Sequence, residues 1–213
     1  MAVLDEAMKK LVIIGASGHG KVIADIALRC GYDEVVFLDD NPAVKNVGEY
    51  VVLGASSLVG ELATEGYDFV VGIGNASIRL RIQNELVGAG CKVVSMVHPS
   101  AEVAYDTTIG TGTVVMAGSV IGTGAVIGDG CVINTSAVVG CDDVIGDFAH
   151  VSVGAKLGDG VEVGSRVWVG IGARVLTGVK ICGSTTIGAG ALVDRDLEEA
   201  GTYVGVPVRL LRS

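Results

Sequence analysis

An aliphatic residue recurs at every sixth position along the second half of the chain. From Val97 to Val193, seventeen consecutive positions at this spacing hold Val, Ile or Leu. A period of six is neither the 3.6 residues of a helix nor the two of a strand, and it is typical of proteins in which each hexapeptide is one structural step. The period therefore predicts a repeat architecture for this part of the chain.

Each hexapeptide has the same internal pattern. The aliphatic residue is usually followed by Gly, Asn or Asp, and a small residue or Val stands four positions after it, as in Ile121-Gly-Thr-Gly-Ala-Val126. We expect one short strand and one corner per hexapeptide, three hexapeptides per coil, and glycines at corners that need a positive φ. At about 4.8 Å per stacked strand, five to six coils would form a prism roughly 26 Å tall.

Residues 1–96 follow a different pattern. Apolar runs predict five strands, at 10–14, 35–38, 51–53, 69–71 and 92–96, and helical patterns occupy 22–28, 57–65 and 76–89. Strands alternating with helices predict a small, Rossmann-like parallel sheet that is covered on its faces. We therefore expect an α/β domain over 1–96 and the coil, with its closing segment, over 97–213.

Composition and charge exclude several classes of protein. The net charge of −9 argues against a general nucleic-acid or membrane binder, because these need a basic surface. The apolar run at 11–14 is too short for a signal peptide or a membrane span, so we expect a cytoplasmic protein. Five cysteines without paired spacing predict reduced thiols, and with only three histidines no metal site is predicted.

Two polar turns follow the first two strands. Gly15-Ala-Ser-Gly-His-Gly20 opens a helix, and such a turn offers N–H groups and a positive dipole end to phosphate. Its GxxGxG spacing differs from the dinucleotide GxGxxG, which disfavours a dehydrogenase. Asp39 and Asp40 end the second strand, where carboxylates can accept hydrogen bonds from ribose or guanine. A purely structural turn is the alternative at both places.

The hexapeptide pattern resembles the left-handed β-helix acyltransferases. With Gly15–Gly20, Phe37–Asp40 and Gly72–Asn75, the whole chain is similar to bacterial N-acetyltransferases of nucleotide-linked 4-amino-6-deoxy sugars and to sialic-acid O-acetyltransferases, most of all to the perosamine branch of O-antigen biosynthesis. The resemblance implies a left-handed parallel β-helix, and acetyl-CoA bound along it between the subunits of a homotrimer. The α/β domain would hold the nucleotide sugar through Ser17, Gly18, His19, Asp39, Asp40 and Gly74.

The stretch from Asn134 to Lys156 resembles the active-site segment of this family. There a histidine, followed by an acidic residue, is the general base for the sugar amine, and this chain has Cys141-Asp142 instead. Imidazole accepts a proton near neutrality, whereas a thiol with a pKa of ~8.5 is only slightly ionised at pH 7. Since a positioned base is worth roughly 10²–10⁴-fold, we expect impaired acetyl transfer by direct attack of the amine.

Other interpretations of Cys141 stay open. It would be an acetyl acceptor in a two-step transfer, an engineered replacement of histidine, or a small corner residue without a role. A near-inactive binder of the same ligands is the alternative to an N-acetyltransferase. A sugar O-acetyltransferase is a further alternative, although an alcohol is less nucleophilic than an amine and needs stronger base catalysis.

The resemblance also implies roles further along the coil. Asp159 stands where the family usually has Gly, and its amide is a candidate oxyanion donor. His150 matches a histidine that contacts acetyl-CoA near the thioester, while Ile171 and Ala189 match contacts of the pantetheine arm. Ordinary surface positions are the alternative for these three residues. Two arginines of the closing segment are candidates for the phosphates: Arg209 and Arg212.

Overall fold

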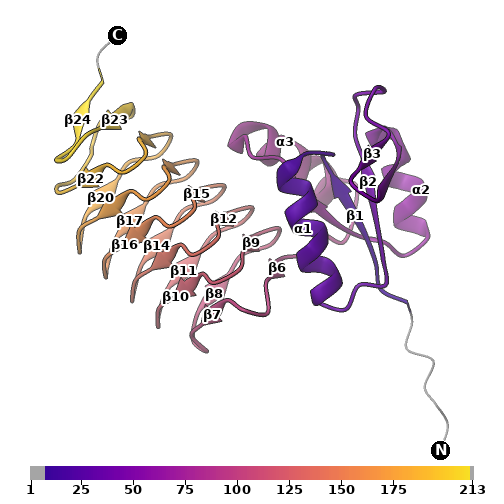
Figure 1. Cartoon of the computed structure of the whole chain (residues 1–213), viewed down its shortest axis with the longest axis horizontal. Coiled ribbons are helices and arrows are strands. Elements are labelled where there is room, and N and C mark those ends of the chain that lie inside the picture. Colours follow the sequence, from indigo (N-terminus) through magenta and orange to yellow (C-terminus); the bar gives the residue numbers. More distant parts are fainter. Residues whose placement is uncertain (1–7, 212–213) are drawn as a thin grey trace, which may run out of the picture.

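The computed structural model describes residues 8–211, which form an α/β domain followed by a three-sided parallel coil (Figure 1). The α/β domain holds a sheet in the order β3-β4-β2-β1-β5, in which only β3 is antiparallel to its neighbour. Its strands are β1 (Lys10–Ile14), β2 (Glu34–Leu38), β3 (Asn46–Val47), β4 (Tyr50–Gly54) and β5 (Asp68–Val71). The predicted parallel sheet is present, with β3 as an addition at its edge.

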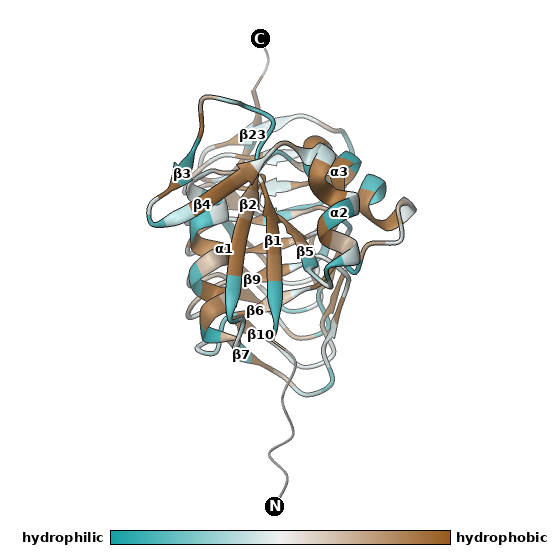
Figure 2. Ribbon diagram, turned by 90° about the vertical axis from the view of Figure 1, so that its right-hand side faces the viewer, coloured by the Kyte–Doolittle hydropathy of each residue, from teal (hydrophilic) through white to brown (hydrophobic). Residues whose placement is uncertain are grey.

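Helices cover both faces of this sheet. They are α1 (Gly18–Arg29), α2 (Val59–Thr64) after the 3₁₀ turn η1 (Ser56–Leu58), and α3 (Ala76–Gly88). Because side chains alternate along a strand, Leu11 and Ile13 pack under α1, while Val12 and Ile14 pack under α2 and α3. Figure 2 shows α1 on one side of β1 and β2, and α2 and α3 on the other.

The predicted strand at 92–96 is mostly absent. Val93 makes an isolated bridge to Phe69 at the edge of β5, and the next strand, β6 (Met96–Val97), already belongs to the coil. The segment leaves the edge of the sheet after this bridge because it must cross to the first coil.

The coil has one two-residue strand per hexapeptide, arranged in three parallel sheets. The first face contains β6, β9 (Val114–Val115), β12 (Val132–Ile133), β15 (His150–Val151), β18 (Trp168–Val169) and β21 (Thr186–Ile187). The second face contains β7 (Glu102–Val103), β10 (Val120–Ile121), β13 (Val138–Val139), β16 (Lys156–Leu157), β19 (Arg174–Val175) and β22 (Leu192–Val193). The third face contains β8 (Thr108–Ile109), β11 (Val126–Ile127), β14 (Val144–Ile145), β17 (Glu162–Val163) and β20 (Lys180–Ile181).

The second residue of each coil strand is the aliphatic residue of the repeat. These side chains line the axis, from Val97 and Val103 at one end to Val193 at the other, and small corner residues such as Ala125 and Ala149 are buried beside them. Each buried Val or Ile contributes about 1.5–3 kcal/mol, so stacking along the axis holds the coil together. The pattern predicted from the period of six is therefore confirmed.

The coil is closed by a hairpin and joined to the α/β domain at its other end. The hairpin, β23 (Thr202–Val204) and β24 (Arg209–Leu210), extends the first face. Arg209 lies on this hairpin, and Arg212 lies outside the described residues.

No helix in the described part of the chain has the length and apolar character needed to cross a membrane.

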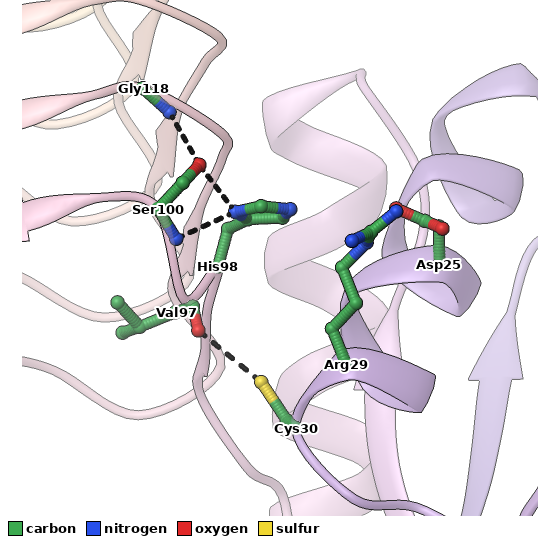
Figure 3. A network of polar contacts seen from close by, with 7 residues as sticks. All are labelled: Asp25, Arg29, Cys30, Val97, His98, Ser100 and Gly118. Carbon is green, nitrogen blue, oxygen red and sulfur yellow. Dashed lines mark hydrogen bonds and ion pairs between the residues drawn. The ribbon is translucent and has the colours of Figure 1, made fainter.

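A hydrogen-bonded network marks the junction between α1 and the first coil (Figure 3). The Cys30 thiol at the end of α1 donates to the Val97 carbonyl at 3.3 Å. His98 Nδ1 accepts the Ser100 N–H at 2.9 Å, and Ser100 Oγ accepts the Gly118 N–H from the next coil at 3.2 Å. These contacts fix how the first coil leaves the α/β domain.

Candidate functional site

The outward side chains of the first face change character where the α/β domain ends. In register they are Val114, Val132, His150 and Trp168, one per coil. Val114 and Val132 are buried in a core shared with the α/β domain, which includes Ile13. His150 is therefore the first polar position beyond the covered part of this face.

His150 lies between two other rings. Its ring centroid is 4.1 Å from that of Trp168 and 6.5 Å from that of His19, which lies in the first turn of α1. The tertiary structure thus brings together two residues, His19 and His150, that the sequence assigned to different ligands.

The hydrogen bonds of Asn134 determine the tautomer of His150. Asn134 Oδ1 accepts the N–H of Thr135 at 2.8 Å, so the Asn134 amide nitrogen faces His150 Nε2 at 3.1 Å and donates to it. A neutral imidazole that accepts at Nε2 carries its proton on Nδ1. Within the described residues this buried Nδ1 has no hydrogen-bond partner. His150 therefore presents an unused N–H donor.

Burial keeps both histidines uncharged at neutral pH. Desolvation, followed by the positive charge of Arg79, lowers the pKa of His150 to about 3 and that of His19 to about 4. His19 Nε2, and the Oγ of Ser152 two residues after His150, are also buried without a partner in the part of the chain described. Because an unsatisfied buried polar group costs about 1–3 kcal/mol, a polar ligand bound here would stabilise the site.

Arg79 is a residue of this site that the sequence reasoning missed. It is 1% exposed, and its guanidinium donates to the carbonyls of Gly130 at 2.7 Å, Gly74 at 2.8 Å and Phe148 at 3.0 Å. Among the described residues it has no carboxylate partner, and burial lowers its pKa to about 10. It adds a buried positive charge that favours an anionic ligand. The sequence held one signal for Arg79: it stands three residues before Ile82, and residues at this spacing share a face of a helix, which is the buried face of α3.

The glycine-rich turn has both structural and open positions. Ser17 caps α1, where its hydroxyl accepts the Gly20 N–H at 3.3 Å. A Cβ atom at Gly20 would collide with the Gly15 carbonyl and the Phe37 ring, so close packing explains this glycine. Gly18 has open space around it, and its N–H in the first helical turn has no acceptor within the helix. Gly18 therefore has open space beside an N–H that is unpaired within the helix.

The two acidic residues after β2 have different roles. The Asp39 carboxylate accepts the N–H groups of Ala16 at 2.8 Å and of Asn41 at 2.9 Å, so it ties the glycine-rich turn to its own turn. Asp40 Oδ1 accepts the Ser56 N–H at 2.8 Å, an interaction that lowers the pKa of Asp40. Asp40 also lines a cavity with Arg81 at the carboxyl ends of β1 and β2. Asp39 also lines part of this cavity, but both of its carboxylate oxygens accept backbone N–H groups.

Cys141, Asp142 and Asp159 lie at the corner between the second and third faces. The Cys141 N–H donates to Asp159 Oδ1 at 2.9 Å, and the Gly160 N–H donates to the Cys141 carbonyl at 2.8 Å. Asp142 has a φ of +56°, at a corner position that Gly124 and Gly160 fill in the adjacent coils. This corner is opposite the first face, so a single chain does not bring Cys141 and His150 together.

The side chain of Asp159 has a structural role that recurs in the coil. At another corner, Asp129 accepts the Thr111 N–H at 2.7 Å, and Asp147 accepts the Asp129 N–H at 2.9 Å. The Asp159 carboxylate likewise accepts an N–H from the preceding coil, that of Cys141. Its own N–H makes no hydrogen bond within the described residues, so the amide is free for an oxyanion.

Ile171 and Ala189 lie one coil apart at the corner between the first and second faces. Both are exposed, Ile171 by 60%. The Gly190 N–H donates to the Ile171 carbonyl at 2.8 Å, which fixes the spacing of these two turns. They form an apolar surface next to the first face, on the same side of the coil as His150.

An α/β domain followed by a hexapeptide coil, with a buried polar site at the junction, defines a β-helix protein of the acyltransferase class. Residues 10–86 match the family model of the PglD N-terminal domain. UDP-N-acetylbacillosamine N-acetyltransferase of Bacillus subtilis is 36% identical over 113 residues, which are 52% of this chain and 52% of that protein. The chain thus spans about half the length of this curated relative in the match.

Solved structures extend the similarity to almost the whole chain. The acetyltransferase domain of PglB from Neisseria gonorrhoeae, in complex with acetyl coenzyme A, has a TM-score of 0.91 and 37% identity over 96% of this chain and 100% of that domain. PerB from Caulobacter crescentus, in complex with CoA and GDP-perosamine, has a TM-score of 0.91 and 37% identity over 97% of this chain and 99% of that protein. The chain belongs to this family of left-handed β-helix N-acetyltransferases.

Proposed function

We propose that this protein transfers an acetyl group from acetyl-CoA to the 4-amino group of a nucleotide-linked deoxyamino sugar, GDP-perosamine or a related compound. The observation that carries the proposal is the neutral, buried His150, whose Nδ1–H is unused and whose ring centroid is 6.5 Å from that of His19. The PerB structure, which contains CoA and GDP-perosamine, supports the same pair of ligands for this chain.

Localisation in the cytoplasm stays a prediction from the sequence.

Each part of the site has a role in binding. The first turn of α1, at Gly18, would meet the phosphates of the nucleotide, because a helix N-terminus favours anions. The Asp40 carboxylate would accept a hydrogen bond from the nucleoside. His150 Nδ1–H would donate to a carbonyl of acetyl-CoA, and its pantetheine arm would lie along Ile171 and Ala189.

The chemistry is a direct attack. The amine nitrogen bonds to the thioester carbonyl carbon, the resulting oxyanion collapses, and the carbon–sulfur bond breaks to release CoA as its thiolate, which receives the proton that the attacking nitrogen loses. The Asp159 N–H would stabilise the oxyanion. A base must remove one proton from the attacking nitrogen, and Cys141 with Asp142 stands where the family has its base. Turnover therefore depends on amine that arrives deprotonated and on proximity.

The placement of the residues supports a site that is shared between subunits. Cys141 and Asp159 are at a corner opposite the face of His150, so we expect the corner of one subunit to complete the site on the first face of its neighbour in a homotrimer. The O-acetyltransferase alternative remains weaker, because an alcohol has to lose its proton during attack and Cys141 is a poor base for that step.

A transfer assay tests the proposal. The protein is incubated with acetyl-CoA and with GDP-, UDP- or dTDP-linked 4-amino-6-deoxy sugars, and the products are identified by mass spectrometry. We expect an acetamido sugar from one of the three nucleotides. Calorimetric binding of acetyl-CoA and a nucleotide sugar without any product would favour the near-inactive binder, and an O-acetylated sugar would favour the other alternative.

A further inference from the structure

One buried carboxylate in the coil has no role in the site described above. Asp143 is 0% exposed. It occupies the small position of the repeat, where Ala125 and Val161 stand in the adjacent coils. Because a buried carboxylate is costly unless it is hydrogen-bonded, a single one among such residues requires a specific set of partners.

The partners of Asp143 are the two turns that carry the candidate catalytic residues. Its Oδ2 accepts the N–H of Gly140, the residue before Cys141, at 2.6 Å. Its Oδ1 accepts the N–H of Val161, two residues after Asp159, at 2.7 Å. One side chain therefore ties the turn of Cys141 and Asp142 to the turn of Asp159.

We propose that Asp143 is a positioning residue that holds the Cys141 turn in register with the Asp159 amide. The inference rests on the proposed function, since it concerns the geometry of the same acetyl-transfer site. Hydrogen bonds to an ionised carboxylate are shorter and stronger than neutral ones. A displacement of about 1 Å between reacting groups can cost on the order of 100-fold in rate. The clamp at Asp143 prevents such a displacement.

The clamp is sensitive to pH. Burial, with smaller contributions from the negative charges of Asp159 in the next coil and Asp142 in its own turn, raises the pKa of Asp143 to about 6, although the hydrogen bonds from Val161 and Gly140 lower it. The ionised carboxylate accepts one hydrogen bond from each amide, one at each oxygen. In the protonated acid one oxygen carries the hydrogen, so only the other oxygen remains a full hydrogen-bond acceptor. The hydrogen bonds to Gly140 and Val161 should therefore weaken as the pH falls through this value.

The first test measures the clamp without turnover. Amide NMR signals of Gly140 and Val161 are followed against pH in the full-length wild type and in Asp143→Asn. We expect an inflection near pH 6 in the wild type and none in the variant. Identical curves for the two proteins would overturn the proposal. If Asp143→Asn does not fold, Asp143→Ser takes its place.

The second test separates positioning from stability with a matched variant. Thr113 stands in the same small position at another corner, and its hydroxyl accepts the Cys131 N–H at 2.9 Å. Both Asp143→Asn and Thr113→Val lose a link between coils, so both should lower the Tm. Only Asp143→Asn should lower kcat, by about 10- to 100-fold, with less than about a threefold change in KM for acetyl-CoA.

The outcomes of the two tests are distinguishable. Equal losses of kcat in both variants would mean that Asp143 has only a structural role, and this result would overturn the proposal. If neither the wild type nor any variant transfers acetyl groups, the proposed function fails, and the NMR curves alone decide whether Asp143 clamps the two turns.

Discussion

The chemistry of this site depends on the protonation of a few side chains. Burial makes His150 a neutral donor at Nδ1, and so it is unsuited to be the base for the amine. The resemblance of the segment around Cys141 to the family's active site makes this thiol the expected occupant of the base position, which stays a prediction. In the proposed function, His150 therefore has a role in binding, and the position expected for the base lies on a different side of the coil.

Restoring an imidazole at position 141 should increase turnover. Because a positioned base contributes roughly 10²–10⁴-fold, we expect Cys141→His to raise kcat/KM by at least about 100-fold near pH 7.5. The measurement is acetamido-sugar formation at saturating acetyl-CoA. Thr123→His, at the same corner one coil earlier, is the matched control and should leave the rate unchanged. An unchanged rate for Cys141→His would contradict the assigned role of this corner.

Acidification should destabilise the protein through its buried histidines. The pKa values of His150, about 3, and His19, about 4, are below the ~6.5 of an unfolded chain. The unfolded state therefore takes up protons first, and stability is lost as the pH falls below about 6.5. Each histidine should cost about 2 kcal/mol at pH 5. The raised pKa of Asp143 acts in the opposite direction, since its ionisation lowers stability as the pH rises through about 6.

The check is a series of Tm values from about pH 7 to pH 5. The wild type should lose more stability than the double variant His19→Asn/His150→Asn, because asparagine does not titrate in this range. Parallel curves would mean that these two side chains do not have the lowered pKa values on which this prediction depends.

At the scale of the element, the corners of the coil set the tolerance to substitution. Most corners have a glycine with positive φ, and five have another residue there: Ser136, Asp142, Phe148, Arg166 and Ser184. A non-glycine residue in this conformation costs roughly 1–2 kcal/mol. The coil tolerates that cost because stacking on both sides holds each turn in place.

Two glycines with similar φ but different surroundings make this testable. A Cβ atom at Gly130, with φ of +58°, would collide with the Phe148 ring, whereas Gly178, with φ of +74°, has open space. Gly178→Ala should cost about 1 kcal/mol from the backbone alone. Gly130→Ala should lower the free energy of unfolding clearly more. The Phe148 ring must move away from the new Cβ atom, while Arg79 holds the Phe148 carbonyl. Chemical denaturation measures both, and equal losses would refute the packing argument.

At the scale of the whole molecule, the contacts of Arg79 and of the junction hold the α/β domain and the coil together as one unit. The guanidinium on α3 reaches the coil at Gly130 and Phe148, and the network around His98 secures the first coil below α1. The glycine-rich turn of α1 and the face of His150 therefore have a fixed relation, as the proposed reaction between two bound substrates needs.

Mixing inactive subunits tests whether the site is shared. The reference protein is Cys141→His, and two inactive partners are compared with it: Cys141→Ala and the double variant Cys141→His/His150→Ala, each of which should lack most of the activity. After the two proteins are unfolded, mixed and refolded together, part of the activity should return, because a mixed trimer contains some intact sites. Sedimentation must show a trimer, and a monomer or a mixture without recovery would rule out a site between subunits.

The sequence alone determined the coil. A strict period of six with glycines at fixed offsets leaves one regular solution for the backbone, because each step sees the same local environment. The α/β domain was also predictable, apart from β3 and the segment at 92–96, since its apolar runs and turns are local signals. Resemblance pointed to His19, Asp40 and Cys141, but it gave no reason for their protonation or contacts.

Only the tertiary structure decided how the residues of the site work together. Docking of the α/β domain covers Val114 and Val132 and leaves His150 at the edge, where burial removes its charge. It also turned Arg79 and Asp143, which read as ordinary charged residues in the sequence, into buried groups bonded to backbone from distant turns. Such effects depend on what surrounds a side chain in space, and a local pattern holds no information about that.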